Sequence, residues 1–353
     1  MKKMCLVILV LLGMCSCGNH YQFPIQHINS VEVIHLLEDS LLNVRALEVV
    51  KETNGAYFLA SNGKAGHIYS SDDKSLNVVY PISMAPDSIK NNFRSLAITS
   101  KNGFGLSIES PARLYKIKND EKKLVYQENH PKVFYDALDF WNDQEGIAIG
   151  DPTDSCLSII ITRDGGNSWS KIPCENLPNA KVGEAAFAAS DTNIAIVGKH
   201  TWVATGGKSS RILYSPDKGE TWQAFETPII QGTETTGMYS IDFYDALNGF
   251  AIGGDYTAPE ANVANKIKTS DGGKTWRVVA SGENPGYRSC VQYVPASNGK
   301  KLVAVGFKGV DVSNNAGDTW RHISDESFYT IRFINDSLAY AAGAGKVSKL
   351  HFN

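Results

Sequence analysis

The chain has 353 residues, of which 42% are hydrophobic, so it is long enough to bury a large core as one big domain or two ordinary ones. Its formal net charge is -3, acidic and basic residues are intermixed, and no run of like charges occurs. Nucleic acid is therefore disfavoured as a partner, because its binding requires a broad basic field.

The first residues, MKKMCLVILVLLGMCSCGNH, have the organisation of a secretory signal. Lys2 and Lys3 precede an apolar run from about Met4 to Met14, which is too short for a comfortable membrane span. Small residues follow this run, as they do where signal peptidases cleave. We therefore expect the mature protein to face an oxidising compartment.

A cysteine at the end of the apolar run resembles the lipobox of bacterial lipoproteins, whose signal peptidase cuts before the cysteine that carries the lipid. Ser16 before Cys17 suits the small residue required at the cut, whereas Met14 before Cys15 suits it less well. The sequence thus predicts a signal peptide over residues 1–16, a lipid on Cys17 and a tether over residues 17–29. The protein would lie in the bacterial cell envelope, anchored to a membrane and facing the periplasm or the outside. Ordinary cleavage with soluble secretion is the alternative.

Three cysteines remain beyond the signal, namely Cys156, Cys174 and Cys290. Cys156 and Cys174 are equidistant from Gly165, so they would face each other in a hairpin that turns on RDGGNS. A disulfide between them suits an oxidising compartment, and two free buried thiols are the alternative. Cys290 would be a small core residue.

Four near-copies of one short motif occur in the second half of the chain. They read TRDGGNSW (162–169), SPDKGETW (215–222), TSDGGKTW (269–276) and SNNAGDTW (313–320). The four tryptophans are 53, 54 and 44 residues apart, which is the size of a four-stranded propeller blade. Short apolar runs between turn residues recur in a fixed order within each unit, as in a four-strand meander. The sequence therefore predicts one all-β propeller domain over residues 30–353.

Counting the first strand of each unit predicts seven blades of four strands. These strands would be VRALEVV (from Val44), FRSLAI (Phe93), YDALDF (Tyr135), EAAFAA (Glu184), YSIDFY (Tyr239), RSCVQYV (Arg288) and YTIRFI (Tyr329). The last unit contains only three strands of its own. The segment SVEVIHLL (30–37) is expected to supply the fourth and to close the ring, which removes open sheet edges.

The four motifs are identified as Asp-boxes, also called BNR repeats. Together with seven blades they resemble the photosystem II stability/assembly factor-like family of propellers, whose bacterial members are often lipoproteins or secreted proteins. The motif itself indicates a propeller and no particular activity, since sialidases, other glycosidases and sorting receptors share it. No photosynthetic role is implied.

Each box is expected to be a structural turn between the two outer strands of a blade. An Asp or Asn side chain bonds backbone N–H groups of the turn, glycine adopts the positive φ of the bend, and tryptophan packs back into the blade. The residues in these roles are Asp164, Trp169, Asp217, Trp222, Asp271, Trp276, Asn315 and Trp320.

A binding site is expected on the face opposite the boxes, where the first strands begin and the loops between the second and third strands lie. Aligning the first strands places these polar residues at the channel mouth: Arg45, Arg94, Asp136, Glu184, Tyr239, Arg288 beside Ser289, and Tyr329. Long loops would add Asp151, His200, Trp202, Arg211, Asp255 and Tyr256. The alternative is that arginines, carboxylates and tyrosines satisfy one another around trapped water.

The preferred function is a non-enzymatic binding or assembly scaffold that holds a protein partner or a glycan at this mouth. The chain contains no fingerprint of a metal, nucleotide or other cofactor site, so we expect no cofactor and no metal. We also expect the protein to be a monomer.

A glycosidase is the alternative function. In a sialidase-like arrangement Arg45, Arg94 and Arg288 would clamp a carboxylate, Tyr239 would lie beside Glu184, and Asp151 would act as the acid. Two carboxylates such as Asp136 and Asp255 could instead hydrolyse a glycoside. A propeller oxidoreductase is less favoured because it would require a cofactor.

Overall fold

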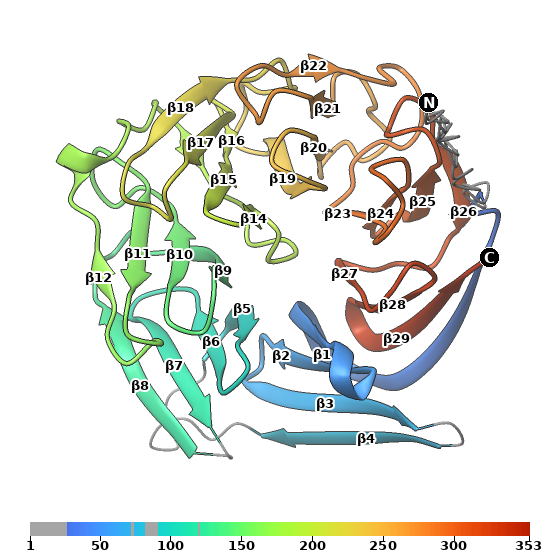
Figure 1. Cartoon of the computed structure of the whole chain (residues 1–353), viewed down its shortest axis with the longest axis horizontal. Helices are drawn as coiled ribbons and strands as arrows, with labels where there is room; N and C mark the ends of the chain where they lie inside the picture. Colours follow the sequence, from blue (N-terminus) through green and yellow to red (C-terminus); the bar gives the residue numbers. More distant parts are fainter. Residues whose placement is uncertain (1–26, 72–73, 82–90, 119–120) are drawn as a thin grey trace, which may run out of the picture.

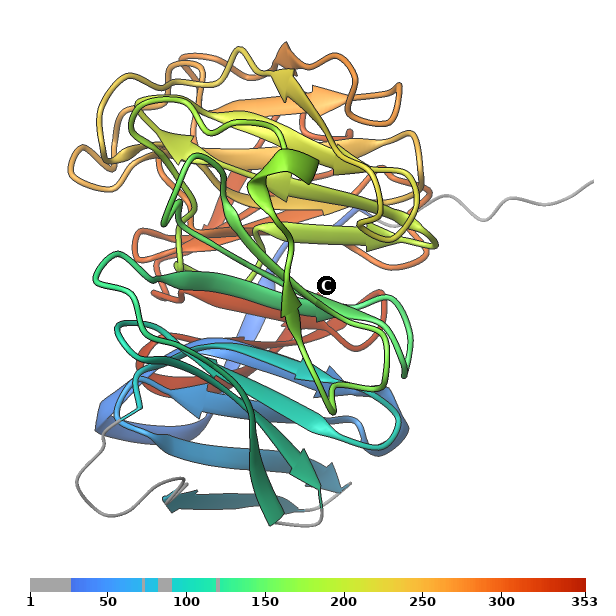
Figure 2. The same ribbon diagram turned by 90° about the vertical axis from the view of Figure 1, so that its left-hand side faces the viewer.

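The computed structural model describes residues 27–71, 74–81, 91–118 and 121–353. In it the strands form twisted sheets around a common axis, as in a β-propeller (Figure 1). Figure 2 shows the ring from the side, with the connecting turns gathered on its two faces. The predicted signal peptide, Cys17 and nearly all of the predicted tether lie outside the described residues. No helix in the described part is long and apolar enough to cross a membrane.

Each repeat contributes strands in order from the axis to the rim. The innermost strands are β1 (Val31–Val50), β5 (Phe93–Ile98), β9 (Tyr135–Phe140), β14 (Ile194–Val197), β19 (Thr236–Phe243), β23 (Cys290–Tyr293) and β27 (Thr330–Phe333). Next come β2 (Gly55–Ala60), β6 (Gly103–Ser107), β10 (Gly146–Gly150), β15 (His200–Ala204), β20 (Gly249–Asp255), β24 (Leu302–Gly306) and β28 (Leu338–Ala342).

The third strands are β3 (Lys64–Ser71), β7 (Ala112–Lys118), β11 (Ser158–Thr162), β17 (Arg211–Ser215), β21 (Lys266–Thr269), β25 (Gly309–Ser313) and β29 (Ala344–Phe352). The rim strands are β4 (Lys74–Pro81), β8 (Glu121–Glu128), β12 (Ser170–Lys171), β18 (Gln223–Glu226), β22 (Arg277–Val278) and β26 (Arg321–Ser324). The remaining elements are β13 (Glu184–Ala185), β16 (Gly206–Gly207) and the short 3-10 helices η1 (Lys51–Thr53) and η2 (Cys174–Asn176).

The all-β class is as predicted, but the prediction of seven blades is wrong. With each hydrogen-bonded sheet counted as one blade, the described chain forms six blades. The reason is β1, which is 20 residues long and continuous where two separate strands were expected. Its first half pairs with β29, from Val31 opposite Phe352, and its second half pairs with β2. The predicted first and last blades are therefore one seven-stranded sheet that joins the two ends of the chain.

The fourth repeat also differs from the prediction. EAAFAA is not its innermost strand, because only Glu184 and Ala185 form a short strand, and they pair with Gly207 and Gly206. The innermost strand is β14, which turns through Gly198 (φ +62°) into β15. Residues 198–211, interpreted as one long loop, therefore contain two strands.

The Asp-box turns join third strands to rim strands on one face of the ring, called here the lower face. In the third of the four boxes, Oδ1 of Asp271 accepts hydrogen bonds from the N–H groups of Lys274 (3.1 Å) and Thr275 (3.0 Å). Trp276 lies edge-on to Phe243, with ring centroids 5.9 Å apart. The glycine of the next box, Gly317, has φ +83°, and a Cβ there would lie 2.1 Å from Phe250 of the preceding repeat. Each box therefore also packs against the repeat before it.

The other boxes have the same geometry. Asp164 Oδ1 accepts from the N–H groups of Asn167 and Ser168, and Asp217 Oδ1 accepts from that of Thr221. In the fourth box Asn315 replaces the acid, and its Oδ1 accepts from the N–H of Thr319 at 2.9 Å. The box tryptophans not yet described, Trp169, Trp222 and Trp320, are buried or half-buried.

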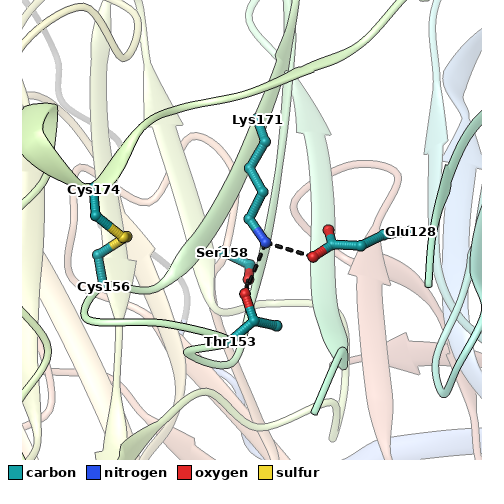
Figure 3. The surroundings of a disulfide bond; sticks show 6 residues. All are labelled: Glu128, Thr153, Cys156, Ser158, Lys171 and Cys174. Atoms are coloured by element: carbon teal, nitrogen blue, oxygen red, sulfur yellow. Dashed lines mark hydrogen bonds and ion pairs between the residues drawn. A yellow bond between two sulfur atoms is a disulfide. The ribbon is translucent and has the colours of Figure 1, made fainter. Parts of the chain in front are cut away.

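A disulfide joins Cys156 to Cys174, with a Cα–Cα distance of 5.4 Å (Figure 3). It ties the segment before β11 to η2, beyond the box turn. Nearby, Nζ of Lys171 contacts Glu128 Oε1 at 2.5 Å and Thr153 Oγ1 at 2.8 Å. Because β8 carries Glu128 and β12 carries Lys171, this ion pair links two neighbouring sheets. The third cysteine, Cys290, is a free buried thiol.

Candidate functional site

Residues 186–193, called here the plug, cross the central channel between β13 and β14. Asp191 accepts hydrogen bonds from the N–H groups of Leu96 (2.7 Å) and Leu138 (3.1 Å), which belong to β5 and β9. Figure 1 shows the lime-green loop beside β14 close to the axis. The sequence reasoning missed the plug, although the polar run Ser190 to Asn193 between two apolar runs is a loop signal.

The plug is bonded to three further inner strands. Ser190 Oγ donates to the Ser289 carbonyl at 2.6 Å, and the Ser190 carbonyl accepts from Thr330 Oγ1 at 2.9 Å. Thr192 Oγ1 donates to Ser240 Oγ at 2.7 Å. The channel is thus filled at this level, and any ligand at the upper face must bind above the plug.

Below the plug, one arginine neutralises acidic groups. Arg332 Nε contacts Glu48 Oε1 at 2.8 Å, and its Nη2 donates to the carbonyls of Ser190 and Asp191. Removal from water and the charge of Glu48 raise the pKa of Asp139 to about 7, although the Phe140 amide and Arg332 oppose this. The lower half of the channel therefore contains its own counter-charges and has a structural role.

Two arginines lie at the upper mouth, which we define by the beginning of the inner half of β1 (from Val44) and the starts of β5 and β27, with the plug backbone between them. Arg45 Nη1 donates to the Ala189 carbonyl at 2.9 Å, and its guanidinium carbon lies 4.0 Å from the Tyr329 ring centroid. Arg94 donates to the Ala188 carbonyl at 3.5 Å and to Asn92 Oδ1 at 3.2 Å. Among the described residues, both arginines therefore donate hydrogen bonds only to uncharged groups.

Neither arginine forms an ion pair with a carboxylate in the described part of the chain. Burial, followed by the charge of Arg45, lowers the pKa of Arg94 to about 10, and burial also lowers the pKa of Arg45. The negative charges of Glu109 and Asp136 oppose this lowering of the Arg94 pKa, but neither carboxylate forms an ion pair with Arg94. The mouth therefore holds two mutually repelling positive charges to which no described carboxylate is bonded.

Asp136 lies beside this pair but does not neutralise it. It is fully buried, and neither carboxyl oxygen accepts a well-aligned hydrogen bond from a described residue. Burial and the charge of Asp151 hold its pKa well above its usual range, while the amide of Ala188 and the charge of Arg94 only partly oppose this. Burial also raises the pKa of Asp151 to about 6, although the Ala186 N–H donates to it at 2.8 Å. The raised pKa of Asp136 therefore favours its protonated, uncharged form.

Aromatic side chains continue the mouth along the side of β19 and β23. The Tyr239 ring stacks on Phe187 of the plug with centroids 4.0 Å apart, and it lies edge-on to Tyr287 at 4.8 Å. Tyr256 (48% exposed) and Phe307 (36% exposed) form the outer edge of the cluster, with Phe307 5.3 Å from Tyr287. The sequence reasoning missed Phe187 and Tyr287, which do not occupy a strand start, and Phe307, whose loop GFKG (306–309) was judged too tight to contribute.

Several residues predicted for the site form ion pairs with each other or with other residues, away from Arg45 and Arg94. Arg288 contacts Asp311 at 2.6 Å, and both side chains are buried. Arg211 contacts Glu184 at 2.6 Å, and Glu184 also accepts from Thr205 Oγ1. These two arginines do not join Arg45 and Arg94 in one clamp.

The acids and the tyrosine of the glycosidase alternative are also dispersed. Tyr239 donates to the Thr235 carbonyl at 2.8 Å and forms no hydrogen bond with Glu184. Asp255 is held by the N–H and hydroxyl of Thr257, and these bonds outweigh the effect of burial and lower its pKa. The described residues thus do not assemble the expected nucleophile pair.

His200 and Trp202 lie in β15 and not in a loop of the upper face. His200 begins the strand beside the lower-face turn and bonds Tyr214 at 2.7 Å. Trp202 is fully buried and donates to the Gly272 carbonyl at 2.8 Å. In the described residues, no group of three or more His, Cys, Asp or Glu side chains is arranged to hold a metal ion.

No protein-family model matches this chain, and no curated protein sequence matches it. Solved structures do resemble it. "YCF48 bound to D1 peptide" has a TM-score of 0.62 and 12% identity over 92% of this chain and 96% of that chain. "Crystal structure of RRP9 WD40 repeats" has a TM-score of 0.64 and 12% identity over 93% and 100%. "Streptogramin B lyase structure" has a TM-score of 0.65 and 12% identity over 92% and 97%.

These similarities show a β-propeller fold. At 12% identity they show the fold alone. The resemblance to the photosystem II assembly factor-like family is thus supported at the level of architecture by the YCF48 structure.

Proposed function

We propose that the protein is a non-enzymatic binding propeller whose upper mouth holds a carboxylate-bearing segment of a protein partner. The observation that supports this most directly is the pair Arg45 and Arg94, which lies at the mouth without a bonded carboxylate in the described chain. Ion pairs satisfy the other channel arginines, Arg288 and Arg332. An external carboxylate would supply the missing counter-charge.

The chemistry of the pair suits a carboxylate. A planar guanidinium can donate two parallel hydrogen bonds to the two oxygens of one carboxylate. The contact of Arg94 with the Ala188 carbonyl is long, at 3.5 Å, so a ligand oxygen could replace it at small cost. Partial burial of both arginines lowers the local dielectric, which strengthens their attraction for an anion.

The aromatic cluster favours a ligand with an apolar group next to the carboxylate. Tyr256 and Phe307 are exposed, whereas Tyr239 and Tyr287 behind them are buried and fixed by ring contacts. Aromatic residues and arginine are the side chains that most often dominate protein interfaces. Because the plug already fixes this surface, little ordering cost would accompany binding.

The comparisons are consistent with a peptide ligand. A propeller of similar architecture is described as bound to a peptide, "YCF48 bound to D1 peptide".

We further propose that Cys17 carries a lipid that keeps the propeller at the cell envelope. Replacing Cys17 by Ser should then move the protein from the membrane fraction to the soluble fraction, and unchanged membrane attachment would contradict the lipid.

The binding proposal can be tested with two matched peptide libraries that differ only in a fixed Glu or Gln beside an aromatic residue. The wild type should retain the Glu library preferentially, and the double variant R45Q/R94Q should lose this preference. R277Q is the matched control, since Arg277 is exposed on the rim strand β22. Equal retention of both libraries by the wild type would contradict the proposal. Stronger binding to an array of acidic glycans than to the Glu library would indicate a glycan ligand in place of a peptide.

A further inference from the structure

A groove of about 750 Å³ separates the first and second repeats. Its walls come from β2 and β3 on one side and from β5, β6 and β7 on the other. Tyr57, His67 and Tyr69 form an aromatic row on the first wall, with Tyr57 and His67 centroids 5.3 Å apart and His67 and Tyr69 4.4 Å apart. Ile98 and Ile117 line the opposite wall. A space of this size is within the range of ligand-binding pockets.

In later repeats the corresponding space is filled by the Asp-box of the following repeat. Trp169 lies 6.4 Å from Phe104 and 5.7 Å from Phe140, and Trp320 lies 5.6 Å from Phe250. A lysine of the preceding repeat fixes the box backbone, since Lys116 donates to the Gly165 carbonyl. Each box therefore inserts an aromatic wedge between two sheets.

Strand register shows that the groove occupies an equivalent wedge position. Phe104 is opposite Ala97 in β5 and opposite Lys116 in β7. In the first repeat Tyr57 is opposite Glu48 and His67, and thus occupies the place of Phe104.

The two walls have equivalent partners as well. Ile98 and Phe140 are each opposite the glycine that begins the next strand, Gly103 and Gly146. Tyr57 and Ile98 therefore stand where Phe104 and Phe140 receive Trp169.

The second repeat does not supply its own wedge. Its third and rim strands, β7 and β8, pair as a continuous hairpin as far as Lys118 opposite Glu121, where other repeats have the box turn. Leu124 takes the sequence position of the box tryptophan and is 44% exposed. The groove thus has the walls of a wedge site without an indole from this hairpin.

The described residues that line the groove carry positive charge. Lys101, Lys118 and Lys122 line it, and no Asp or Glu is among its described lining residues. An occupant with negative charge beside an aromatic group would match both walls.

We propose that this groove binds an acidic peptide segment of a partner protein and receives one of its aromatic side chains in the position of the missing box tryptophan. The acidic residues on either side of that aromatic residue pair with Lys101 and Lys118. This site is separate from the upper mouth and does not depend on Arg45 or Arg94.

The test uses the full chain and a fluorescein-labelled, capped pentapeptide, Glu-Glu-Trp-Glu-Glu. Binding is measured by fluorescence polarisation. The same peptide with Ala in place of Trp should bind at least about tenfold more weakly, as expected for a truncated interface anchor. Replacing all four Glu residues by Gln should also weaken binding.

Two variants address the groove itself. I98W fills it from the wall of the second repeat, and K101E/K118E reverses its charge at two exposed positions without changing the core. Both should abolish the Trp-dependent binding. K274E is the matched control, because Lys274 is exposed in an Asp-box turn of another repeat. R45Q/R94Q should bind as the wild type does, which separates this site from the mouth.

The proposal is overturned if the wild type does not bind the pentapeptide, or if Ala replaces Trp without loss. It is also overturned if K101E/K118E, folded with an unchanged melting temperature, binds as tightly as the wild type. A loss of binding in R45Q/R94Q but not in the groove variants would place the peptide at the mouth and not in the groove.

Discussion

The Asp191 carboxylate accepts a 2.7 Å hydrogen bond from the backbone N–H of Leu96, so a loop of the fourth repeat holds an inner strand of the second. The second oxygen of Asp191 holds the N–H of Leu138 in the third repeat. This one side chain therefore connects three consecutive repeats.

Replacing Asp191 by Ala should destabilise the whole propeller. Two buried backbone N–H groups would lose their partner, and each such group costs about 1–3 kcal/mol, so we expect a loss of about 2–6 kcal/mol. Urea unfolding followed by tryptophan fluorescence measures this. Asp336 is exposed in the turn before β28, so Asp336→Ala should have almost no effect on the free energy of unfolding. A similar small effect of both variants would show that the plug is not a structural crosslink.

The carboxyl of Asp139 should make the stability depend on pH. Its pKa in the folded protein is about 7, above the ordinary value of 3.8. The unfolded chain therefore holds fewer protons at this carboxyl between these two values. The contribution of Asp139 to the free energy of unfolding is complete below about pH 4 and falls as the pH rises through about 7.

Asp139→Asn removes this titration. The free energy of unfolding of the variant, relative to that of the wild type, should thus increase between about pH 4 and pH 7. Unfolding curves of both proteins at several pH values measure this difference. A difference independent of pH would mean that Asp139 titrates alike in the folded and unfolded states.

The Asp-box acid should be replaceable by Asn but not by Ala. Asp271 accepts two backbone N–H bonds in its turn, and Asn315 makes one such bond in the equivalent place of the fourth box. We expect Asp271→Ala to cost about 1–3 kcal/mol and Asp271→Asn clearly less. Thermal unfolding of the two variants compares them. If both lose the same stability, the charge of Asp271 matters more than its hydrogen bonds.

The disulfide should add stability by closing an 18-residue separation in the chain. The double variant C156S/C174S is expected to lose about 2–4 kcal/mol, because the bridge restricts the unfolded chain. Peptide mapping without reductant should recover Cys156 and Cys174 in one linked product. Recovery of two separate thiol peptides from the purified protein would contradict the bridge.

Sequence reasoning identified features that depend on neighbouring residues. The boxes around Asp164, Asp217 and Asp271 are visible because turn chemistry is local, and their spacing indicates a propeller. The pairing of residues 30–37 with the C-terminal strand followed from the missing strand of the last repeat. Arg45, Arg94 and Tyr329 were placed together at the mouth for the same reason, since strand starts are equivalent in all repeats.

The errors arose where distant contacts decide between similar local patterns. EAAFAA and the run at Ile194 are both short and apolar, and only the bonds of the plug to other repeats select the second as the inner strand. The pairing of Arg288 with Asp311 also joins separate strands, so it left no signal at either position. The blade count failed because β1 is continuous and serves two predicted blades.

The central claim is that Arg45 and Arg94 together bind a carboxylate at the upper mouth. Its most direct test follows the Nε–H signals of the arginines by nuclear magnetic resonance while the best Glu peptide from the library is added. We expect saturable shifts of the Arg45 and Arg94 signals with this peptide, and none with its Gln counterpart. Saturable binding that leaves both signals in place, or that shifts only exposed arginines such as Arg277, would contradict it.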